Sequence, residues 1–230
     1  MNIEARLEEV RAEYLRRMTR GDGHLLHEVE TYASSCNGKM LRPRMLLLSA
    51  ATLGEEHFLS SRTLLLAVCV EMLHNASLLH DDVIDHADSR RGRPSVNAHW
   101  GNSVAVLVGD YLLAQTMQLL DEVGDNDATR QVNQTVLSMV EAELLAQETL
   151  NQSSNPTIKQ YLSIIDGKTA NLFALAASLG NPQYKNFGLH YGRLFQMRDD
   201  IADNEAPEFV EELIEKETQE INNMKYKLSI

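Results

Sequence analysis

The stretch RTLLLAVCVEMLHNASLLHDDVID, residues 62–85, is apolar on nearly every side of a helix until it reaches its acidic end. Its interior polar residues are confined to positions 71–80, and they are Glu71, His74, Asn75, Ser77 and His80. A helix that is hydrophobic all round is buried in a protein core. The stretch therefore predicts a long central helix whose C-terminal end carries clustered aspartates.

Helical periodicity also dominates the rest of the chain. Apolar residues recur every three or four positions through 2–19, 40–53, 60–86, 102–121, 128–150, 157–180, 186–203 and 207–227, a pattern typical of amphipathic helices. Glycine, asparagine and proline occupy the short breaks, and no segment shows the alternation of a convincing strand. With 230 residues, 43% of them hydrophobic, the chain can build one substantial core. We expect a single all-α domain over residues 1–230.

Composition excludes several classes of protein. A formal net charge of −12 argues against a nucleic-acid binder, which needs clustered Lys and Arg to neutralise phosphates. The cysteines, Cys36 and Cys69, form neither a disulfide framework nor a metal-ligand spacing, which favours the cytoplasm. Residues 1–18 lack the apolar core of a signal peptide. Wholly apolar runs such as 64–70 are far shorter than a membrane span of ~20 residues, so we expect no transmembrane segment.

The acidic motif at the end of the central helix occurs twice. DDVID at residues 81–85 and DDIAD at residues 199–203 both read D-D-x-x-D, each directly after an apolar helical stretch. On a helix the first and last aspartates of such a motif share a face, where like charges destabilise each other. Carboxylates without neighbouring His or Cys ligands favour Mg²⁺, which binds through one or two carboxylates plus phosphate oxygens. The motifs therefore predict a metal-bridged diphosphate.

Two other interpretations of the acidic motifs are weaker. Acidic pairs at helix ends are often only solvated, but the repetition of the whole motif argues against that reading. A di-iron helical bundle needs a Glu-x-x-His pair on each of two helices, and only Glu71 and His74 have this spacing here.

Basic residues lie where an anion would be expected. Lys39 and Arg42 lie three positions apart at the start of an apolar helix. Cations at a helix N-terminus oppose the helix dipole unless an anion binds there. Arg90 and Arg91 follow the first motif closely enough to reach a diphosphate held on magnesium. Lys39 and Arg42 are otherwise interpreted as two surface cations.

Further polar residues lie in apolar helical patterns near the second motif. In IIDGKTANLF, residues 164–173, Lys168 and Thr169 interrupt the apolar pattern, and Asp166 is a candidate partner for Lys168 in a purely structural interpretation. Gln196 lies three residues before Asp199, on about the same helical face. It can donate a hydrogen bond to phosphate or cap a polar patch.

Taken together, these stretches resemble the all-trans isoprenyl diphosphate synthases, which condense isopentenyl diphosphate with an allylic diphosphate. The resemblance runs from about residue 38 to residue 203, where the family's motifs occur in order: GKMLRP, EMLHNASLLHDDVID, SRRGRPS, GDYLLA, DGKTANLFALAASLG and FQMRDDIAD. It implies a helical bundle around a deep central cavity with both motifs at its mouth. It also implies a homodimer and up to three Mg²⁺ ions with bound diphosphate.

The resemblance assigns a role to each candidate residue. The implied magnesium ligands are Asp81, Asp85 and Asp199, supported through waters by Asp82, Asp200 and Asp203. Groups around the allylic diphosphate are Arg90, Lys168, Thr169 and Gln196. The implied isopentenyl diphosphate pocket is formed by Lys39, Arg42, His74 and Arg91. Without the resemblance, His74 would be interpreted as a core histidine.

The resemblance also implies how product length is set. The growing chain is expected to run down the central helix from the aspartates, past Ser77, Ala76, Leu73 and Val70. In this family, bulky aromatic side chains four or five positions before the motif stop the chain early. The small Ser77 and Ala76 therefore indicate a product longer than fifteen carbons.

Residues 204–230 depart from the family pattern. They form a short acidic helical segment without the Gly-Lys pair and covering helices that usually follow the second motif, so the fold is expected to be shortened at its C-terminus. One alternative function is therefore a noncatalytic or partner-dependent subunit that binds diphosphates. A class I terpene cyclase is a second alternative, although it has no isopentenyl diphosphate for Lys39, Arg42 and Arg91 to bind.

Overall fold

A computed structural model describes residues 1–230 except 19–23, 36–37, 151–154 and 230. Cys36 lies outside the described residues. The chain divides into two compact units, Met1–Arg44 with Leu59–Asp125 and Met45–Phe58 with Asn126–Ile230. Each unit is built almost entirely of helices, which confirms the all-α prediction. The single domain and its central cavity stay predictions.

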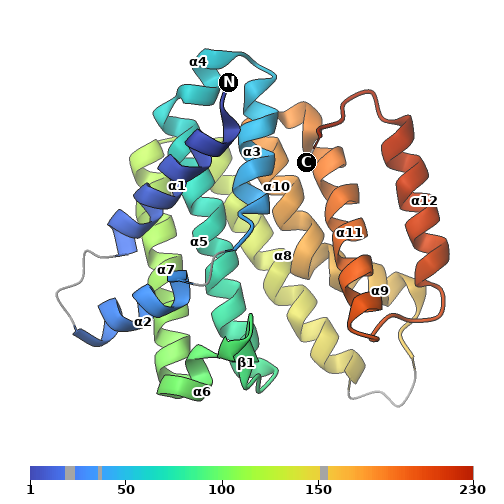
Figure 1. Ribbon diagram of the computed structural model, residues 1–230. Coiled ribbons are helices and arrows are strands. Elements are labelled where there is room, and N and C mark those ends of the chain that lie inside the picture. The colour runs from blue at the N-terminus through green and yellow to red at the C-terminus, as the bar shows by residue number, and fades with distance from the viewer. Residues whose placement is uncertain (19–23, 36–37, 151–154, 230) are drawn as a thin grey trace. The chain divides into compact units, whose positions relative to one another are not determined.

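Helix α5, Ser61–Ile84, is the core of the first unit and packs along α7, Asn102–Val123, and α1, Ile3–Met18 (Figure 1). Ser60 caps its N-terminus by accepting a 3.1 Å hydrogen bond from Thr63 N. Every residue from Leu66 to Leu73 is buried. The prediction of a central helix is thus confirmed, and the first aspartate motif is attached to the most deeply packed element of this unit.

The first unit contains elements that the sequence did not predict. Helix α2, His24–Ser35, lies in a segment for which no helix was predicted. A short hairpin follows α5, with β1, Ser89–Arg90, paired antiparallel to β2, Arg93–Pro94. Strands of this length are too short to show an alternating pattern, so the expectation of no strand was wrong. Helix α6, Val96–Trp100, connects the hairpin to α7.

The hairpin turns at Arg91 and Gly92. Both have positive φ, 52° and 75° respectively, as a two-residue turn of type I′ requires. Glycine adopts this conformation readily, whereas arginine rarely does. The turn therefore holds Arg91 in a sparsely populated backbone conformation directly beside the first aspartate motif.

The second unit packs helices around α10, Asn171–Gly180, whose residues Leu172–Gly180 are all buried. Around it lie α8, Asn126–Leu150, and α11, Lys185–Ala202, with α9, Ile158–Ile165, and α12, Val210–Asn223, packed against α11. The remaining elements are α4, Glu55–Leu59, the 3₁₀ turn η2, Pro182–Tyr184, and part of α3, Leu41–Ala51. A Cβ on Gly180 would lie 2.3 Å from Leu46 O, so this glycine allows α3 and α10 to approach closely.

The long helix predicted over 157–180 is interrupted by η1, a π-helical turn at Asp166–Ala170. A π turn widens the helix locally and frequently occurs at functional sites. The turn contains the predicted site residues Lys168 and Thr169. Periodicity along the sequence does not reveal such a turn, because one widened turn changes the spacing of apolar residues only slightly.

Two of the described helices, α5 and α7, are long and apolar enough to cross a membrane by length and composition alone. In α5, 61% of the apolar window is buried inside the protein, and in α7 the share is 39%. Core helices of water-soluble proteins have the same length and composition. The expectation of no transmembrane segment stays a prediction.

Candidate active site

The first aspartate motif ends α5 with a Schellman C-cap. Asp85 is the cap residue, and its backbone N donates to Asp81 O at 2.8 Å. His86 follows in the left-handed region with φ 51°, and Ala87 N donates back to Asp82 O at 2.9 Å. This is the hydrogen-bond pattern by which a left-handed residue closes a helix.

The second aspartate motif ends α11 in the same way. Asp203 is the cap residue, and its N donates to Asp199 O at 2.9 Å. Asn204 is left-handed with φ 59°, and Glu205 N donates to Asp200 O at 2.8 Å. The repeated sequence motif is therefore a repeated backbone structure, with its three aspartates in corresponding positions.

The electrostatics of this arrangement are unfavourable without a cation. A helix C-terminus carries roughly half a negative charge, and carboxylates placed there are repelled by it. Both motifs gather their aspartates in this position. Among the described residues, no three His, Cys, Asp or Glu side chains are arranged to hold a metal by themselves. The donor set fits Mg²⁺, which needs only one or two carboxylates and completes its shell with water and phosphate oxygens.

Asp82 is held by the hairpin through Arg90. Its side chain is 4% exposed, and its Oδ1 accepts from Arg90 Nε at 2.9 Å and from Arg90 Nη2. Asn97 Nδ2 donates to the backbone O of Asp82 at 3.0 Å. Arg90 is thus placed beside the motif, as predicted, and its role towards a diphosphate stays a prediction.

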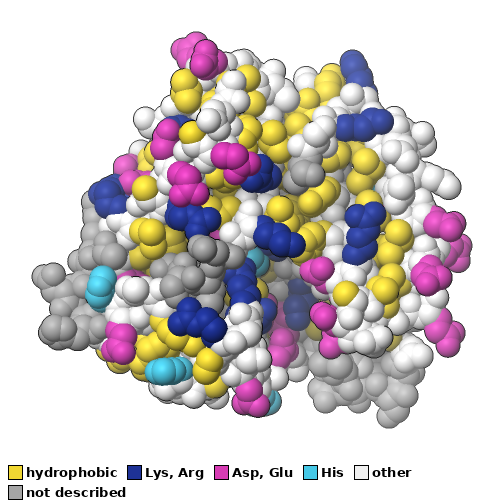
Figure 2. All heavy atoms as spheres, viewed as in Figure 1, with side chains coloured by type: hydrophobic (Ala, Val, Ile, Leu, Met, Phe, Trp, Pro, Cys, Tyr) yellow, Lys and Arg dark blue, Asp and Glu magenta, His cyan; other side chains and the backbone are white. Residues whose placement is uncertain are grey.

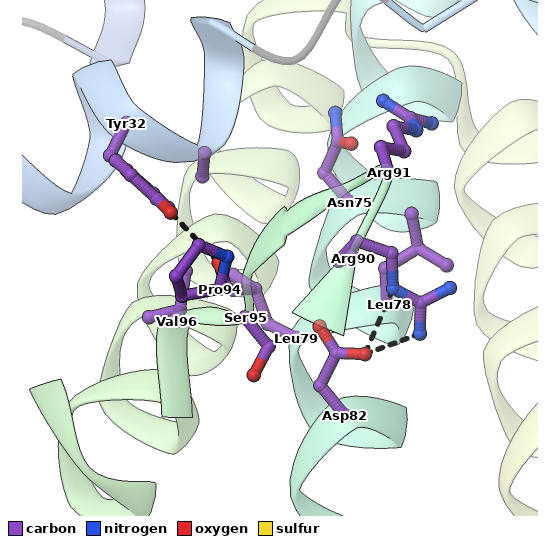
Figure 3. A pocket seen from close by; sticks show the side chains of 11 residues that line it. Tyr32, Asn75, Leu78, Leu79, Asp82, Arg90, Arg91, Pro94, Ser95 and Val96 are labelled. Atoms are coloured by element: carbon purple, nitrogen blue, oxygen red, sulfur yellow. Dashed lines mark hydrogen bonds and ion pairs between the residues drawn. The ribbon is translucent and has the colours of Figure 1, made fainter. Parts of the chain in front are cut away.

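Asp82, Arg90 and Arg91 line a cavity of about 50 Å³ in the first unit (Figure 3). Figure 3 shows the two arginine side chains leaving the hairpin in different directions, with the Arg90 guanidinium against Asp82 and that of Arg91 pointing away from it. The other lining residues are Tyr32, Ala33, Asn75, Leu78, Leu79, Pro94, Ser95 and Val96.

Arg91 belongs to a second group of predicted residues, formed with Arg42 and His74. Burial, followed by the charges of Arg42 and Arg91, holds the pKa of His74 well below its usual range. The same two cations oppose the rise that burial causes in the pKa of Glu71. A Cβ on Gly38 would lie 3.1 Å from Arg91 Nη1. The structure therefore gathers Arg42, His74 and Arg91 beside the segment that begins at Gly38.

Lys39 is an exposed member of the predicted isopentenyl diphosphate pocket.

The residues predicted to set product length lie on α5. Leu73 and Ala76 are 3% and 1% exposed. Ser77 is half-buried, and its Oγ donates to His74 O at 2.9 Å. Buried small and aliphatic side chains are compatible with an apolar path along α5. That path stays a prediction.

In the second unit, several predicted residues form one hydrogen-bonded chain. Thr169 Oγ1 donates to Gln196 Oε1 at 2.6 Å, and Gln196 Nε2 donates to Asp200 Oδ1 at 2.7 Å. The other carboxylate oxygen of Asp200 accepts from the Tyr161 hydroxyl at 2.5 Å. The structure thus brings together Thr169, Gln196 and Asp200, which the sequence placed in two separate segments.

Lys168 pairs with a residue other than the one considered from the sequence. Its Nζ lies 2.6 Å from Glu143 Oε2 on α8, whereas Asp166 is bound by Arg193 of α11 through two contacts of 2.6 and 2.7 Å. The structural interpretation that paired Lys168 with Asp166 was therefore wrong. In a π turn these neighbours point to different helices, which a straight helical pattern does not show.

Sequence reasoning missed three residues that contact the predicted residues of the second unit or their neighbours, namely Tyr161, Glu143 and Arg193. Each contacts a predicted site residue or its neighbour across at least 25 positions of sequence. Glu143 belongs to an acidic pattern on α8 that gave no indication of its partner. Tyr161 and Arg193 fit an ordinary helical pattern, so only the packing of α8, α9 and α11 reveals them.

Comparison with known proteins identifies the family. The model of the polyprenyl synthetase family matches residues 23–226, a longer stretch than the quoted motifs cover. The chain belongs to the polyprenyl synthetase family. The family match extends through α12.

Individual relatives agree with this membership. The chain is 38% identical over 188 residues to an all-trans-nonaprenyl-diphosphate synthase (geranyl-diphosphate specific) of Rhodobacter capsulatus, covering 78% of this chain and 57% of the relative. It is 34% identical to heptaprenyl diphosphate synthase component 2 of Bacillus subtilis, covering 82% and 56%. A polyprenyl synthase from Caulobacter crescentus, solved with calcium and isoprenyl diphosphate, superposes with a TM-score of 0.79 at 32% identity, covering 86% of this chain and 62% of that one.

The chain spans about 57% of the length of its nonaprenyl relative. The family and the helical fold are therefore shared, whereas the activity of the whole relatives belongs to the proposal that follows.

Proposed function

We propose that this polyprenyl synthetase is a Mg²⁺-dependent trans-prenyltransferase that condenses isopentenyl diphosphate with an allylic diphosphate. The observation that carries the proposal is the repeated helix end, at which two D-D-x-x-D motifs adopt the same Schellman cap. Carboxylates gathered at the negative end of a helix favour a divalent cation. A relative solved with calcium and isoprenyl diphosphate supports this pairing of ligands.

Bound Mg²⁺ would act as a Lewis acid on the diphosphate leaving group, with Asp81, Asp85 and Asp199 as its direct ligands. By the same resemblance, Asp82, Asp200 and Asp203 would orient the ligands and their waters, and Asp82 and Asp200 already accept hydrogen bonds from protein donors. This division of roles follows the predicted ligand set.

The basic and polar residues then act on the substrates. Arg90, Lys168, Thr169 and Gln196 bind the allylic diphosphate and stabilise the negative charge that develops as its carbon–oxygen bond breaks. The double bond of isopentenyl diphosphate, bound by Lys39, Arg42, His74 and Arg91, attacks the carbocation, and a proton is lost to the pyrophosphate. Water must be excluded because it would quench the cation.

The proposed product is longer than fifteen carbons. Ala76 and Leu73 are buried on α5 and carry no aromatic ring, and the curated relatives include nonaprenyl and octaprenyl diphosphate synthases. Replacement of Ala76 by Phe would place a large ring on the proposed path. Chromatography of the products should then show shorter chains, and an unchanged chain length would refute the assignment of Ala76.

The proposal includes a cytoplasmic homodimer. In the first unit α7 exposes Val106, Leu107 and Met117, and in the second unit α8 exposes Leu137, Val140 and Leu144. Apolar stripes of this kind support burial against another chain. The alternative is a partner-dependent subunit, which the name of the Bacillus subtilis relative, component 2, favours. Light scattering of the purified chain distinguishes a homodimer from a monomer that needs a partner.

The deciding experiment supplies purified protein with Mg²⁺, labelled isopentenyl diphosphate and allylic primers of several lengths. Elongated product that disappears with a chelator and returns with Mg²⁺ supports the synthase. Formation of a cyclic hydrocarbon without isopentenyl diphosphate would show that the protein is a terpene cyclase instead. Diphosphate binding without product would show that it is a noncatalytic subunit. Asp81→Asn and Asp199→Asn should each remove elongation, while Asp88→Asn, outside both motifs, should leave it intact.

A further inference from the structure

Helix α12 presents a single buried acid among exposed ones. Glu211, Glu212, Glu215 and Glu220 are exposed, whereas the Glu217 side chain is 5% exposed. Figure 2 shows acidic side chains along the edge where Figure 1 places α12. A charged carboxylate is buried only where it has charged or hydrogen-bonding partners. Glu217 therefore marks a specific attachment of α12.

The partners of Glu217 lie one helical turn apart on α11. Arg193 Nη1 donates to Glu217 Oε1 at 3.0 Å, and His190 Nδ1 contacts Glu217 Oε2. Val210 and Leu213 of α12 are buried in an apolar cluster with Met197 of α11. Apolar packing and a buried ion pair thus dock α12 on the helix that ends in the second aspartate motif.

Arg193 also extends this attachment to the π turn. Its Nε and Nη2 bind the two carboxylate oxygens of Asp166 at 2.6 and 2.7 Å, the fork geometry that only arginine provides. Asp166 is the first residue of η1. One guanidinium therefore connects α12, α11 and η1.

Two side-chain pairs join η1 to α11 at the same sequence spacing. Asp166 pairs with Arg193, and Thr169 donates to Gln196; each pair is separated by 27 residues in sequence. Lys168, which lies between Asp166 and Thr169, pairs with Glu143 of α8. The orientation of Lys168 and Thr169 therefore depends on both pairs that join η1 to α11.

Glycines bring η1 close to its neighbours and leave little freedom for other placements. A Cβ on Gly167 would lie 2.2 Å from Ala142 Cβ of α8, and one on Gly192 would lie 2.6 Å from Ala170 Cα. Because η1 packs closely against backbone on two sides, the two side-chain pairs with α11 limit the movement that η1 can still make.

We infer that α12 is a positioning element for the allylic diphosphate site, acting through Glu217, Arg193 and Asp166 on the π turn that carries Lys168 and Thr169. The inference rests on the proposed function, because it assigns those two residues to the allylic diphosphate. Arg193 and Glu217 are assigned no contact with substrate and act through Asp166. They determine how rigidly η1 holds the Lys168 ammonium group and the Thr169 hydroxyl group.

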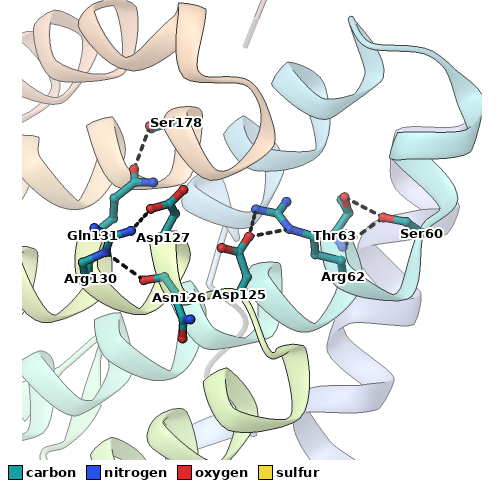
Figure 4. A network of polar contacts seen from close by, with 9 residues as sticks. All are labelled: Ser60, Arg62, Thr63, Asp125, Asn126, Asp127, Arg130, Gln131 and Ser178. Carbon is teal, nitrogen blue, oxygen red and sulfur yellow. Dashed lines mark hydrogen bonds and ion pairs between the residues drawn. The ribbon is translucent and has the colours of Figure 1, made fainter.

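The test compares Arg193→Lys and Glu217→Gln with Arg62→Lys. Arg62 makes a more exposed two-nitrogen contact in the first unit, with Nε and Nη2 at 2.9 and 2.7 Å from the single oxygen Oδ2 of Asp125 (Figure 4). Each lysine keeps the positive charge and loses the fork. The readouts are KM for each substrate, kcat per folded molecule, and hydrogen exchange of backbone amides 166–171.

In Arg193→Lys and Glu217→Gln, KM for the allylic diphosphate should rise about tenfold, while KM for isopentenyl diphosphate stays within about twofold. Amides 166–171 should exchange about tenfold faster than in the wild type. Arg62→Lys should show neither change. Equal effects on both KM values, or unchanged exchange in folded Arg193→Lys and Glu217→Gln, would overturn the inference.

Failure of the proposed function has a different signature. If the wild-type chain elongates no primer, the prenyltransferase proposal fails, and the exchange experiment alone decides the role of α12. Faster exchange of amides 166–171 in both Arg193→Lys and Glu217→Gln, with Arg62→Lys unchanged, then retains α12 as the element that positions η1. Unchanged exchange removes that role as well.

Discussion

The hydroxyl group of Tyr161 donates a 2.5 Å hydrogen bond to Oδ2 of Asp200 across 39 positions of sequence. Gln196 Nε2 donates to Oδ1 of the same carboxylate at 2.7 Å, so both oxygens of the middle aspartate are oriented by the protein. Burial, followed by the hydrogen bond to Asp200, raises the pKa of Tyr161. The hydroxyl therefore stays a donor throughout the pH range in which the protein would work.

Replacing Tyr161 by Phe removes this donor and little volume. A hydrogen bond to a charged group contributes about 1.5–3 kcal/mol, so turnover should fall roughly tenfold. The Mg²⁺ concentration needed for half-maximal activity should rise as well. Turnover measured over a series of Mg²⁺ concentrations checks both the lower turnover and the higher half-maximal concentration. Tyr226→Phe, which changes a tyrosine that packs on Tyr184, is the control. A Tyr161→Phe protein with lower stability but the same magnesium dependence would contradict the assignment.

Asp85→Asn should stabilise the metal-free protein and strongly lower its activity with Mg²⁺. Asp85 caps the C-terminus of α5, where a negative charge opposes the helix dipole by about 0.3–1 kcal/mol. Urea denaturation without metal should show a gain of this size, while turnover with Mg²⁺ falls on the order of 100-fold. Asp88 is an exposed aspartate outside the motif, and Asp88→Asn should change neither the stability without metal nor the turnover with Mg²⁺. Loss of stability in metal-free Asp85→Asn would contradict the argument.

Glu30 predicts a pH dependence of stability. It is 1% exposed, and burial raises its pKa from 4.5 to about 7. Between these values the folded chain keeps a proton that the unfolded chain releases, so the free energy of unfolding falls as pH rises. The loss should be on the order of 3 kcal/mol and nearly complete by pH 8.

Glu30→Gln should remove this component of the pH dependence and stabilise the protein at pH 8. Urea denaturation at several pH values between 4.5 and 8 measures the slope for each variant. Glu28→Gln changes an exposed acid on the same helix and should keep the wild-type slope. If both variants titrate alike, the pH dependence arises elsewhere.

Gly167→Ala should destabilise the second unit, although alanine is normally the better helix former. The new Cβ would lie 2.2 Å from Ala142 Cβ and 2.6 Å from Ser138 O. Overpacking of this kind costs about 1–3 kcal/mol, measurable by urea denaturation. Ala142→Gly should recover part of the loss in the double variant. A neutral Gly167→Ala would show that η1 and α8 can separate easily.

Local patterns in the sequence predicted the long helices well. The apolar stretch before Asp81 became the buried helix α5, and the second D-D-x-x-D stretch ends α11 as its spacing indicated. Both predictions depend only on neighbours within one helix, where a period of 3.6 residues determines which side chains share a face. The basic pair Arg90 and Arg91 was also found near the first motif, because both residues lie in the short hairpin that follows α5.

Elements whose conformation depends on other segments were predicted less well. The π turn η1 looks like ordinary helix in the sequence, and the two-residue strands around Arg91 have no length over which to alternate. Lys168 was given Asp166 as a candidate partner, whereas it pairs with Glu143. For Lys168 the deciding contact comes from a segment that is distant in the sequence.

The sequence by itself therefore determined the helical architecture, the repeated aspartate motif and the family, because all of these are written in spacings of a few residues. Only the tertiary structure decided that Tyr161 orients Asp200 and that Arg193 joins Asp166 to Glu217. Such contacts arise when helix faces pack together, and the pairing of two faces depends on the shape and charge of the whole unit.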